Sequence, residues 1–332
     1  MSEKMFQFSP ADYAAQFAKK GYVHIRGGLT ESFFAKVVAQ VEQSMKTKLM
    51  KEFAIGDKQQ AMYEFPDDDG DYVNELCTKV AQVTGLGPQD MVLSERHVKA
   101  YAADAAAEPH AHKDRFASEI SVGLSVHVKE GSTLVLFPYD ELETNPFNTS
   151  VQLRASLSPE RYPEPRLKQA KPVEIKDAAR DVIVFRGHNF WHLRANPALT
   201  TMLYFKMNSF NCDPLGEDPR TPVMRSKTQA AIDAKVEEIE RMIPLIGRRV
   251  DYFHRHYNRN WQDVPGVVLW GEKHFTLDED EFRMLKGVDG KKSVGALLDA
   301  IGGAAAAADR SAKIEKVKRL ARRGVIDLVN GK

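Results

Sequence analysis

Two patterns of hydrophobic and polar positions divide the chain. Apolar residues recur at helical spacing over residues 9–21, 30–53 and 73–84, and Ser9 and Thr30 are suited to cap the first two segments. Between these two segments, YVHIRGG alternates apolar and polar residues and therefore predicts a strand. The N-terminal part of the chain thus predicts helices with a single strand between the first two.

From about residue 91 the pattern changes to short runs rich in β-branched and aromatic residues, separated by Gly, Pro, Asn and Asp. The runs are VLSERHVKAY, EISVGLSVHV, STLVLFPY, TSVQLRASL, PVEIK, DVIVFRG and TTMLYFKMNSF. Short strands at this spacing predict an antiparallel sandwich or barrel that ends near Pro214. The predicted fold class is mainly β with flanking helices.

The last third of the chain returns to helical spacing. Residues 222–258 predict a helix that Pro244 breaks or kinks, and the tail from residue 267 predicts strand, helix, helix, helix and short strand. The size and order of this tail suit a small α+β winged-helix module. We therefore expect a β domain over residues 1–215, a helical linker over 216–262 and a winged-helix domain over 263–332.

Composition narrows the function classes. The chain has 332 residues and a formal net charge of +1, which argues against a general attraction to nucleic acid or membranes. Its two cysteines, Cys77 and Cys212, lie far apart, which argues against a disulfide framework and a thiolate zinc site. No signal-peptide pattern and no apolar run of membrane-spanning length is present, so we expect a cytoplasmic protein.

Candidate chemistry begins at the triplet His112-Lys113-Asp114. Residues i and i+2 of a strand point to the same side, so the histidine and the aspartate can bind one metal ion. A non-haem Fe(II) oxygenase site needs one more imidazole, and the hydrophobic run DVIVFRG leads to His192. The alternatives are a polar loop for the triplet and a buried histidine packed beside Trp191. His110 and His188 are interpreted as loop residues.

These segments together resemble the Fe(II)/2-oxoglutarate dioxygenases, in particular the phytanoyl-CoA dioxygenase-like group, over about residues 10–210. FAKKGYVHIRGGLTESFF resembles the entry segment of that group, and RHVKAYAADAAAEPHAHKD resembles the strand and loop before its metal motif. SEISVGLSVHVKEGSTLVLFPYD resembles the paired strands that follow, and RDVIVFRGHNFWH resembles the segment with the distal histidine. The resemblance implies a double-stranded β-helix, a jelly-roll or cupin-like fold.

The same resemblance implies that Fe(II) is held by His112, Asp114 and His192, and that 2-oxoglutarate and O2 are co-substrates. The implied reaction hydroxylates a small-molecule, amino-acid or peptide-borne substrate via a ferryl intermediate and releases succinate and CO2. Because Asp114 fills the position that related halogenases leave to a small residue, hydroxylation is favoured over halogenation.

The chain departs from this family at the co-substrate anchor. The family places an arginine on the strand after the distal histidine, but the corresponding run LTTMLYFKMNSF has none. Lys206 on that run, Arg194 two residues beyond His192, and the hydroxyl of Thr201 or of Thr200 are the candidates. A surface charge is the alternative for either cation.

Substrate-side residues are expected on two of the predicted strands. Lys99 and Tyr101 lie on the strand before the metal motif, and Arg154 lies with Gln152 on TSVQLRASL. An exposed strand charge is the alternative interpretation for Arg154.

The tail from residue 274 to residue 329 resembles the PqqD-like winged-helix module, which binds a leader peptide at a sheet edge in peptide-modifying systems. Its last predicted helix is basic, with Lys313, Lys316, Lys318, Arg319, Arg322 and Arg323. The acidic run at 278–281 offsets this charge. We therefore expect a homodimer or substrate-domain contact first, a leader-peptide contact next and nucleic acid last. A cupin-like metal or ligand sensor with a winged-helix output is the rival hypothesis for the whole chain.

Overall fold

The structure is a computed structural model, and it describes residues 4–47, 58–66, 71–107, 109–138, 143–210, 212–213, 218, 232–247, 250–269, 273–302 and 307–330. The chain divides into two compact units. The first unit consists of residues 1–143 and 162–209, and the second consists of 144–161 and 210–332. Each unit has a hydrophobic core of its own.

The N-terminal segment folds as its pattern predicts. Helix α1 (Ala11–Lys20) leads through Gly21 into strand β1 (Tyr22–Ile25), and helices α2 (Glu31–Thr47) and α3 (Tyr72–Thr84) follow. Gly21 has a φ of 72°, and its N–H donates to Phe17 O at 2.7 Å, which ends the first helix. The predicted helices and the strand between the first two are confirmed over the described residues; residues 48–53 of the second predicted helix lie outside them.

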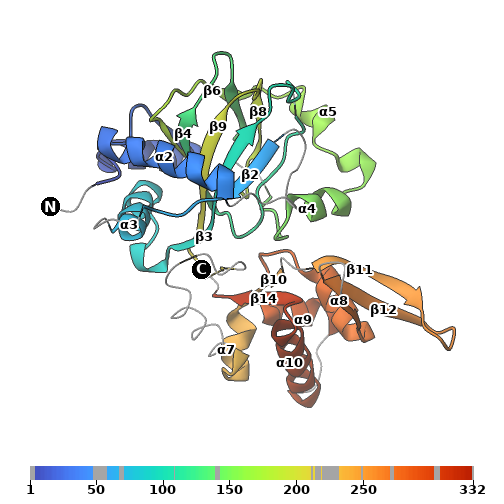
Figure 1. The fold of residues 1–332 in the computed structure, drawn as a ribbon. Helices are drawn as coiled ribbons and strands as arrows, with labels where there is room; N and C mark the ends of the chain where they lie inside the picture. Colours follow the sequence, from blue (N-terminus) through green and yellow to red (C-terminus); the bar gives the residue numbers. More distant parts are fainter. Residues whose placement is uncertain are drawn as a thin grey trace. The chain divides into compact units, whose positions relative to one another are not determined.

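The first unit contains two antiparallel sheets (Figure 1). The larger has six strands in the order β1-β7-β4-β9-β3-β2, and the smaller has three in the order β6-β5-β8. Their bounds are β2 Lys58–Met62, β3 Val92–Tyr101, β4 Ile120–His127, β5 Thr133–Phe137, β6 Val173–Ile175, β7 Val182–Phe185, β8 Trp191–Ala195 and β9 Thr201–Asn208. The 3-10 turn η2 (Pro88–Asp90) lies between β2 and β3 in sequence, and the short helix α5 (Glu164–Leu167) lies between β5 and β6. The class, mainly β with helices, is confirmed.

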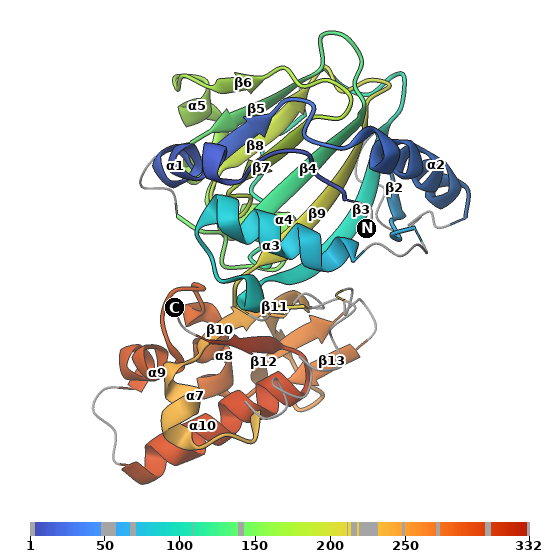
Figure 2. The same cartoon turned by 90° about the vertical axis from the view of Figure 1, so that its left-hand side faces the viewer.

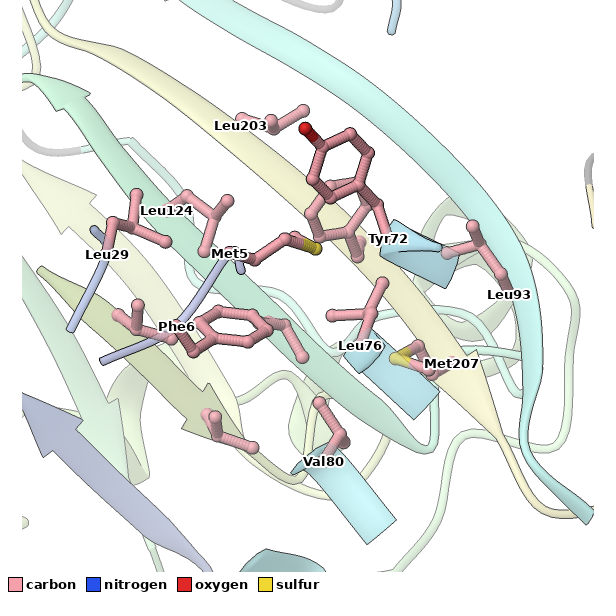
Figure 3. Close-up of a cluster of buried hydrophobic side chains, with 14 of the residues drawn as sticks. Met5, Phe6, Leu29, Tyr72, Leu76, Val80, Leu93, Leu124, Leu203 and Met207 are labelled. Carbon is pink, nitrogen blue, oxygen red and sulfur yellow. The ribbon is translucent and has the colours of Figure 1, made fainter. Parts of the chain in front are cut away.

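The core of this unit lies between the helices and one face of the larger sheet. Side chains from α1, α2 and α3 pack against alternate residues of β3, β4, β7 and β9. Figure 2 shows the helices on this face, and Figure 3 shows Leu76 of α3 beside Met207 of the sheet. A smaller cluster, which includes Leu136 and Phe185, joins the two sheets. The remaining face of β3, β4 and β9 is therefore free to carry polar chemistry.

Two secondary-structure expectations are wrong. TSVQLRASL forms helix α4 (Ser150–Ser156) instead of a strand, because the Thr149 side chain caps the helix by accepting from Gln152 N–H at 3.0 Å. Residues 222–258 were expected to be helical. In their described part, α7 (Val236–Arg241) is followed by the strands β10 (Ile243–Ile246) and β11 (Val250–Tyr257). β10 forms because β14, far along the chain, pairs with it, and β11 forms a hairpin with the next strand, β12.

In the second unit, β10 pairs with β14 (Ile326–Val329), and β11, β12 (Asp263–Leu269) and β13 (Lys273–Thr276) form a three-stranded sheet. Helices α8 (Glu279–Gly287), α9 (Val294–Gly302) and α10 (Ala307–Arg322) follow, so the predicted order of strand, three helices and short strand is confirmed. The 3-10 turn η3 (Pro159–Arg161) and α4 belong to this unit as well. Within the described ranges, no helix is long and apolar enough to cross a membrane.

Candidate metal centre

Two backbone hydrogen bonds bring the expected ligands together. His112 and Asp114 lie on the segment before β4, and His192 lies on β8 of the smaller sheet. His112 N–H donates to His192 O, and His192 N–H donates to His112 O, both at 2.9 Å. This antiparallel bridge joins two segments that are eighty residues apart in sequence and places the imidazole rings 4.4 Å apart between centroids.

The three side chains present their ligating atoms to a common point. Asp114 Oδ1 lies 3.9 Å from His112 Nε2, and Asp114 Oδ2 lies 3.7 Å from His192 Nε2. One ligating atom from each residue lies within 4.8 Å of the other two. Asp114 and His192 are buried and His112 is half-buried, so the cluster is enclosed on one side only.

Hydrogen bonds orient two of these ligands. His192 Nδ1 lies 2.9 Å from Phe190 O, which can only accept, so Nδ1 carries the proton and the Nε2 lone pair faces the cluster. Asp114 N–H donates to Gly187 O at 3.0 Å, and Asp114 Oδ2 accepts from Ser121 Oγ at 2.5 Å. These contacts leave Asp114 Oδ1 as the carboxylate oxygen on the His112 side.

Lys206 neutralises the aspartate. Its buried ammonium contacts Asp114 Oδ2 and also donates to Ser121 Oγ at 3.0 Å. Burial raises the pKa of Asp114, but Lys206, His192 and His112 outweigh it and hold that pKa well below its usual value of 3.8. Burial lowers the pKa of His192 to about 4, with Asp114 opposing the shift. The site therefore holds a carboxylate anion beside a neutral imidazole, which is the protonation state that metal binding requires.

Gly187 makes the close packing around the aspartate possible. A Cβ atom at this position would lie 2.1 Å from Ser121 Oγ and 2.6 Å from Asp114 Oδ2. Both distances are shorter than any real contact, so a side chain here would displace the carboxylate.

Arg194 and Thr201, the other residues expected to anchor the co-substrate, have different surroundings from Lys206. Arg194 is buried on β8, where its two terminal nitrogens each lie 3.0 Å from an oxygen of Asp177, and one also donates to Ser132 Oγ at 3.2 Å. The guanidinium is thus committed to an internal carboxylate. Thr201 shares a strand face with Leu203, which packs in the helix-covered core, so it points away from the face that carries Lys206.

Lys99 and Tyr101 lie on β3, next to β9, on the face that carries the site. The Lys99 ammonium lies 5.1 Å from the centroid of the Tyr204 ring, and the Lys206 ammonium lies 4.9 Å from the same centroid. The charge of Lys99 also lowers the pKa of Asp114. Burial raises the pKa of the Tyr101 phenol. The ammonium groups of Lys99 and Lys206 therefore both lie near the Tyr204 ring, beside the three candidate metal ligands.

The remaining candidates lie on other segments of the chain. Arg154 lies on α4, in the second unit. His110 is exposed and lies 3.3 Å from Glu164, and His188 Nδ1 lies 2.9 Å from Phe116 O.

Sequence reasoning missed Ser121, Gly187, Asp177 and Tyr204. The signal for Ser121 is the alternation in ISVGLSVH, which places small residues at every second position of an otherwise apolar strand. Asp177 gives no local signal, because its role depends on Arg194 of another strand.

Comparisons with known proteins find similarity only among solved structures. No family model and no curated protein matches the chain. The similar structures include the non-haem α-ketoglutarate-dependent epimerase SnoN from nogalamycin biosynthesis, at 15% identity and a TM-score of 0.44, covering 59% of this chain and 80% of that one. The carbocyclase SnoK from the same biosynthesis has 12% identity and a TM-score of 0.44, with 62% and 87% covered. A prolyl-4-hydroxylase from Pseudomonas putida has 13% identity and a TM-score of 0.41, with 60% and 98% covered. Any conclusion on function must therefore rest on the residues of the site.

Proposed function

We propose that the first unit is an Fe(II)- and 2-oxoglutarate-dependent oxygenase with a double-stranded β-helix fold. The observation that carries this proposal is the convergence of His112, Asp114 and His192, whose ligating atoms lie within 4.8 Å of one another. Two imidazoles and one carboxylate on one side of an enclosed site are the ligand set of non-haem Fe(II) oxygenases. When bound, the iron supplies the activation of O2 for oxidation of a substrate C–H bond.

The charges beside the cluster favour a dianionic co-substrate such as 2-oxoglutarate. A divalent ion held by Asp114 retains one net positive charge, and Lys206 and Lys99 add two more on the adjoining face. We assign the far carboxylate of 2-oxoglutarate to these two lysines. Arg194 is a weaker candidate because Asp177 already occupies its guanidinium in a bidentate pair.

The protein's own residues supply orientation and exclusion of water. Ser121 and Lys206 fix Asp114 Oδ2, and the Phe190 carbonyl fixes the imidazole of His192. The Phe185 ring lies 4.9 Å from the His192 ring and shields that side of the site. The substrate, a small molecule, an amino acid or a peptide-borne residue, approaches from the side where His112 is half-exposed.

The test combines anaerobic Fe(II) titration with turnover. The wild-type chain is expected to bind Fe(II), to show a weak visible band on addition of 2-oxoglutarate and to form succinate in air, with a +16 mass shift in a substrate from cell extract. His112→Ala and His192→Ala are each expected to lose one equivalent of Fe(II) and the succinate. His110→Ala is the matched control, because this exposed histidine lies outside the cluster.

Two results would contradict the proposal. One is retention of the full Fe(II) stoichiometry by both ligand variants. The other is Fe(II) binding at this cluster without consumption of 2-oxoglutarate by the wild-type chain.

We propose that the second unit has a winged-helix fold and contacts either the substrate or a second copy of the chain. The basic side chains of α10 are paired within the unit: Lys316 lies 2.6 Å from Asp280, and Arg319 lies 2.8 Å from Glu281. Because these cations already have acidic partners, a DNA-binding output for a sensor is disfavoured. The expected result is no salt-dependent DNA binding by the full chain in an electrophoretic shift assay.

A further inference from the structure

Three histidines gather on the three-stranded sheet of the second unit. His254 and His256 lie on β11, and His274 lies on β13, with β12 between them. The ring centroids are 5.0 Å apart for His254 and His256, 4.7 Å for His256 and His274, and 5.5 Å for His254 and His274. One ring nitrogen from each histidine lies within 4.8 Å of the other two. This cluster shares no residue with the oxygenase site.

The sheet register explains why the rings converge. His254 and His256 are two residues apart on one strand, so both point to the same face. Gly266 of β12 pairs with His254 and lies beneath the rings. A Cβ atom on Gly266 would lie 2.6 Å from His274 Nε2 and 3.1 Å from His256 Cε1. The absence of a side chain on the central strand therefore provides the space in which the imidazoles meet.

The opposite face of β11 is occupied by packing and ion pairs. Phe253 packs against Phe282 of α8 with ring centroids 6.0 Å apart, and Arg255 lies 2.9 Å from Glu279. The histidines consequently lie on the face that does not pack against α8. His254 and His256 are half-buried and His274 is exposed, so a bound ion can be reached from solvent.

Two ring nitrogens of the cluster have no hydrogen-bond partner among the described residues. Nδ1 of His254 and Nδ1 of His256 are shielded from solvent, yet neither has a partner in the part of the chain that the structure describes. Leaving a buried polar atom unpaired is destabilising. Burial, and then the neighbouring His256 and His274, lower the pKa of His254.

We propose that His254, His256 and His274 bind a divalent late first-row transition-metal ion, for which Zn²⁺ is the probe. Imidazole suits these ions, whereas Mg²⁺ and Ca²⁺ require oxygen ligands, and the cluster contains none. Tetrahedral Zn–N bonds of about 2.0–2.1 Å place the nitrogens about 3.3 Å apart, which modest rotations of the rings achieve. With three neutral ligands the ion keeps its full charge and a fourth position for water or an anionic donor.

The experiment uses the full, tag-free chain carrying His112→Ala and His192→Ala, so that the first cluster cannot bind metal. Titration with Zn²⁺ against a chromophoric chelator is expected to give one equivalent. Co²⁺ is expected to give the intense visible bands of four-coordinate geometry. Because even the hydrogen-bond partners of metal ligands are worth about 10- to 100-fold in affinity, His254→Ala or His274→Ala should weaken binding by about 100-fold or more.

Two further variants sharpen the test. Gly266→Ala keeps all three ligands but places a Cβ among the rings, so it should also weaken Zn²⁺ binding, while circular dichroism confirms the fold. His110→Ala, at an exposed histidine in the first unit, should leave the affinity unchanged.

The background for these variants is the chain that carries His112→Ala and His192→Ala. The proposal is overturned if this background chain binds no Zn²⁺ equivalent, or if adding His254→Ala or His274→Ala to it leaves the affinity for Zn²⁺ unchanged. Should the background chain fail to fold, the otherwise wild-type chain serves instead. It is expected to bind two equivalents, which fall to one in His254→Ala. An unchanged stoichiometry in that variant overturns the proposal equally.

Discussion

Replacement of Lys206 by Met tests the electrostatic design of the metal centre. Lys206 is 3% exposed, and its ammonium contacts the buried carboxylate of Asp114. Methionine has a similar length and an apolar end, so it fills the space without supplying the charge. The substitution therefore removes the ammonium that contacts this buried carboxylate in the metal-free protein.

The size of the expected loss of stability follows from the burial of the Lys206–Asp114 ion pair. Breaking a buried ion pair by removing one partner costs about 3–5 kcal/mol, because the remaining charge is uncompensated. A divalent ion supplies a replacement charge. At a concentration about 100 times its Kd, bound metal stabilises the wild-type chain by about 2.7 kcal/mol. The increment should be larger in Lys206→Met, because there the metal also neutralises Asp114.

The dependence on pH has a definite sign. In the wild-type chain the pKa of Asp114 is held well below its usual value of 3.8 by Lys206 and the histidines, against the effect of burial. The stabilisation from this anion is present above that usual value and is lost as the pH falls through the lower folded-state pKa. The loss of unfolding free energy in the Lys206→Met variant should therefore be complete at neutral pH and should become smaller in acid.

Hydrogen exchange on peptides from β4 and β9, with chelator and with metal, reports the opening free energy of this unit directly. The Lys206→Met/Asp114→Asn double variant completes a mutant cycle and should recover part of the loss. The reasoning fails if, in the presence of chelator, the opening free energy of Lys206→Met lies within about 0.5 kcal/mol of the wild-type value, which is the scatter of neutral surface substitutions. It also fails if the metal stabilises both chains equally.

Three further predictions concern the first unit. Burial lowers the pKa of His97 from 6.5 to about 4, so this residue should contribute about 2 kcal/mol to the fall in stability between pH 7 and pH 5, and His97→Phe should remove that part in urea titrations of the metal-free chain, while the similar part from His192 is retained. Gly187→Ala should displace Asp114 and weaken anaerobic Fe(II) binding, and an unchanged affinity would contradict the packing argument. Arg194→Met should cost about 3–5 kcal/mol in denaturant unfolding, while the double change with Asp177→Leu should cost less because it leaves no unpaired charge.

Local pattern predicted the elements whose signal lies within a few residues. The spacing of apolar residues and the end of α1 at Gly21 placed the N-terminal helices correctly. Alternation gave most of the strands, and the spacing of His112 and Asp114 identified two residues that share one side of the site. Where a local cap competed, as Thr149 does for α4, the apolar alternation of the same residues was misleading.

Strand pairing decided the rest. Residues 250–257 contain the alternation YFHRHY, but the preceding helical pattern and Pro244 suggested a broken helix. Only their register with β12 makes them a strand and brings His254 and His256 to His274. A periodic pattern cannot identify its partner, because the partner's position depends on sheet order.

The sequence by itself determined the N-terminal helices, the helices of the tail, the strand-rich middle of the chain and the types of residue that can bind a metal, since these follow from spacing and side-chain chemistry. Tertiary structure decided that His192 joins the triplet through a backbone bridge, and that Lys206 rather than Arg194 faces Asp114. The physical reason is that an ion pair or a ligand set forms between strands whose neighbours in space are remote in sequence. Their contacts are fixed by hydrogen-bond register across the sheet, which short-range periodicity does not encode.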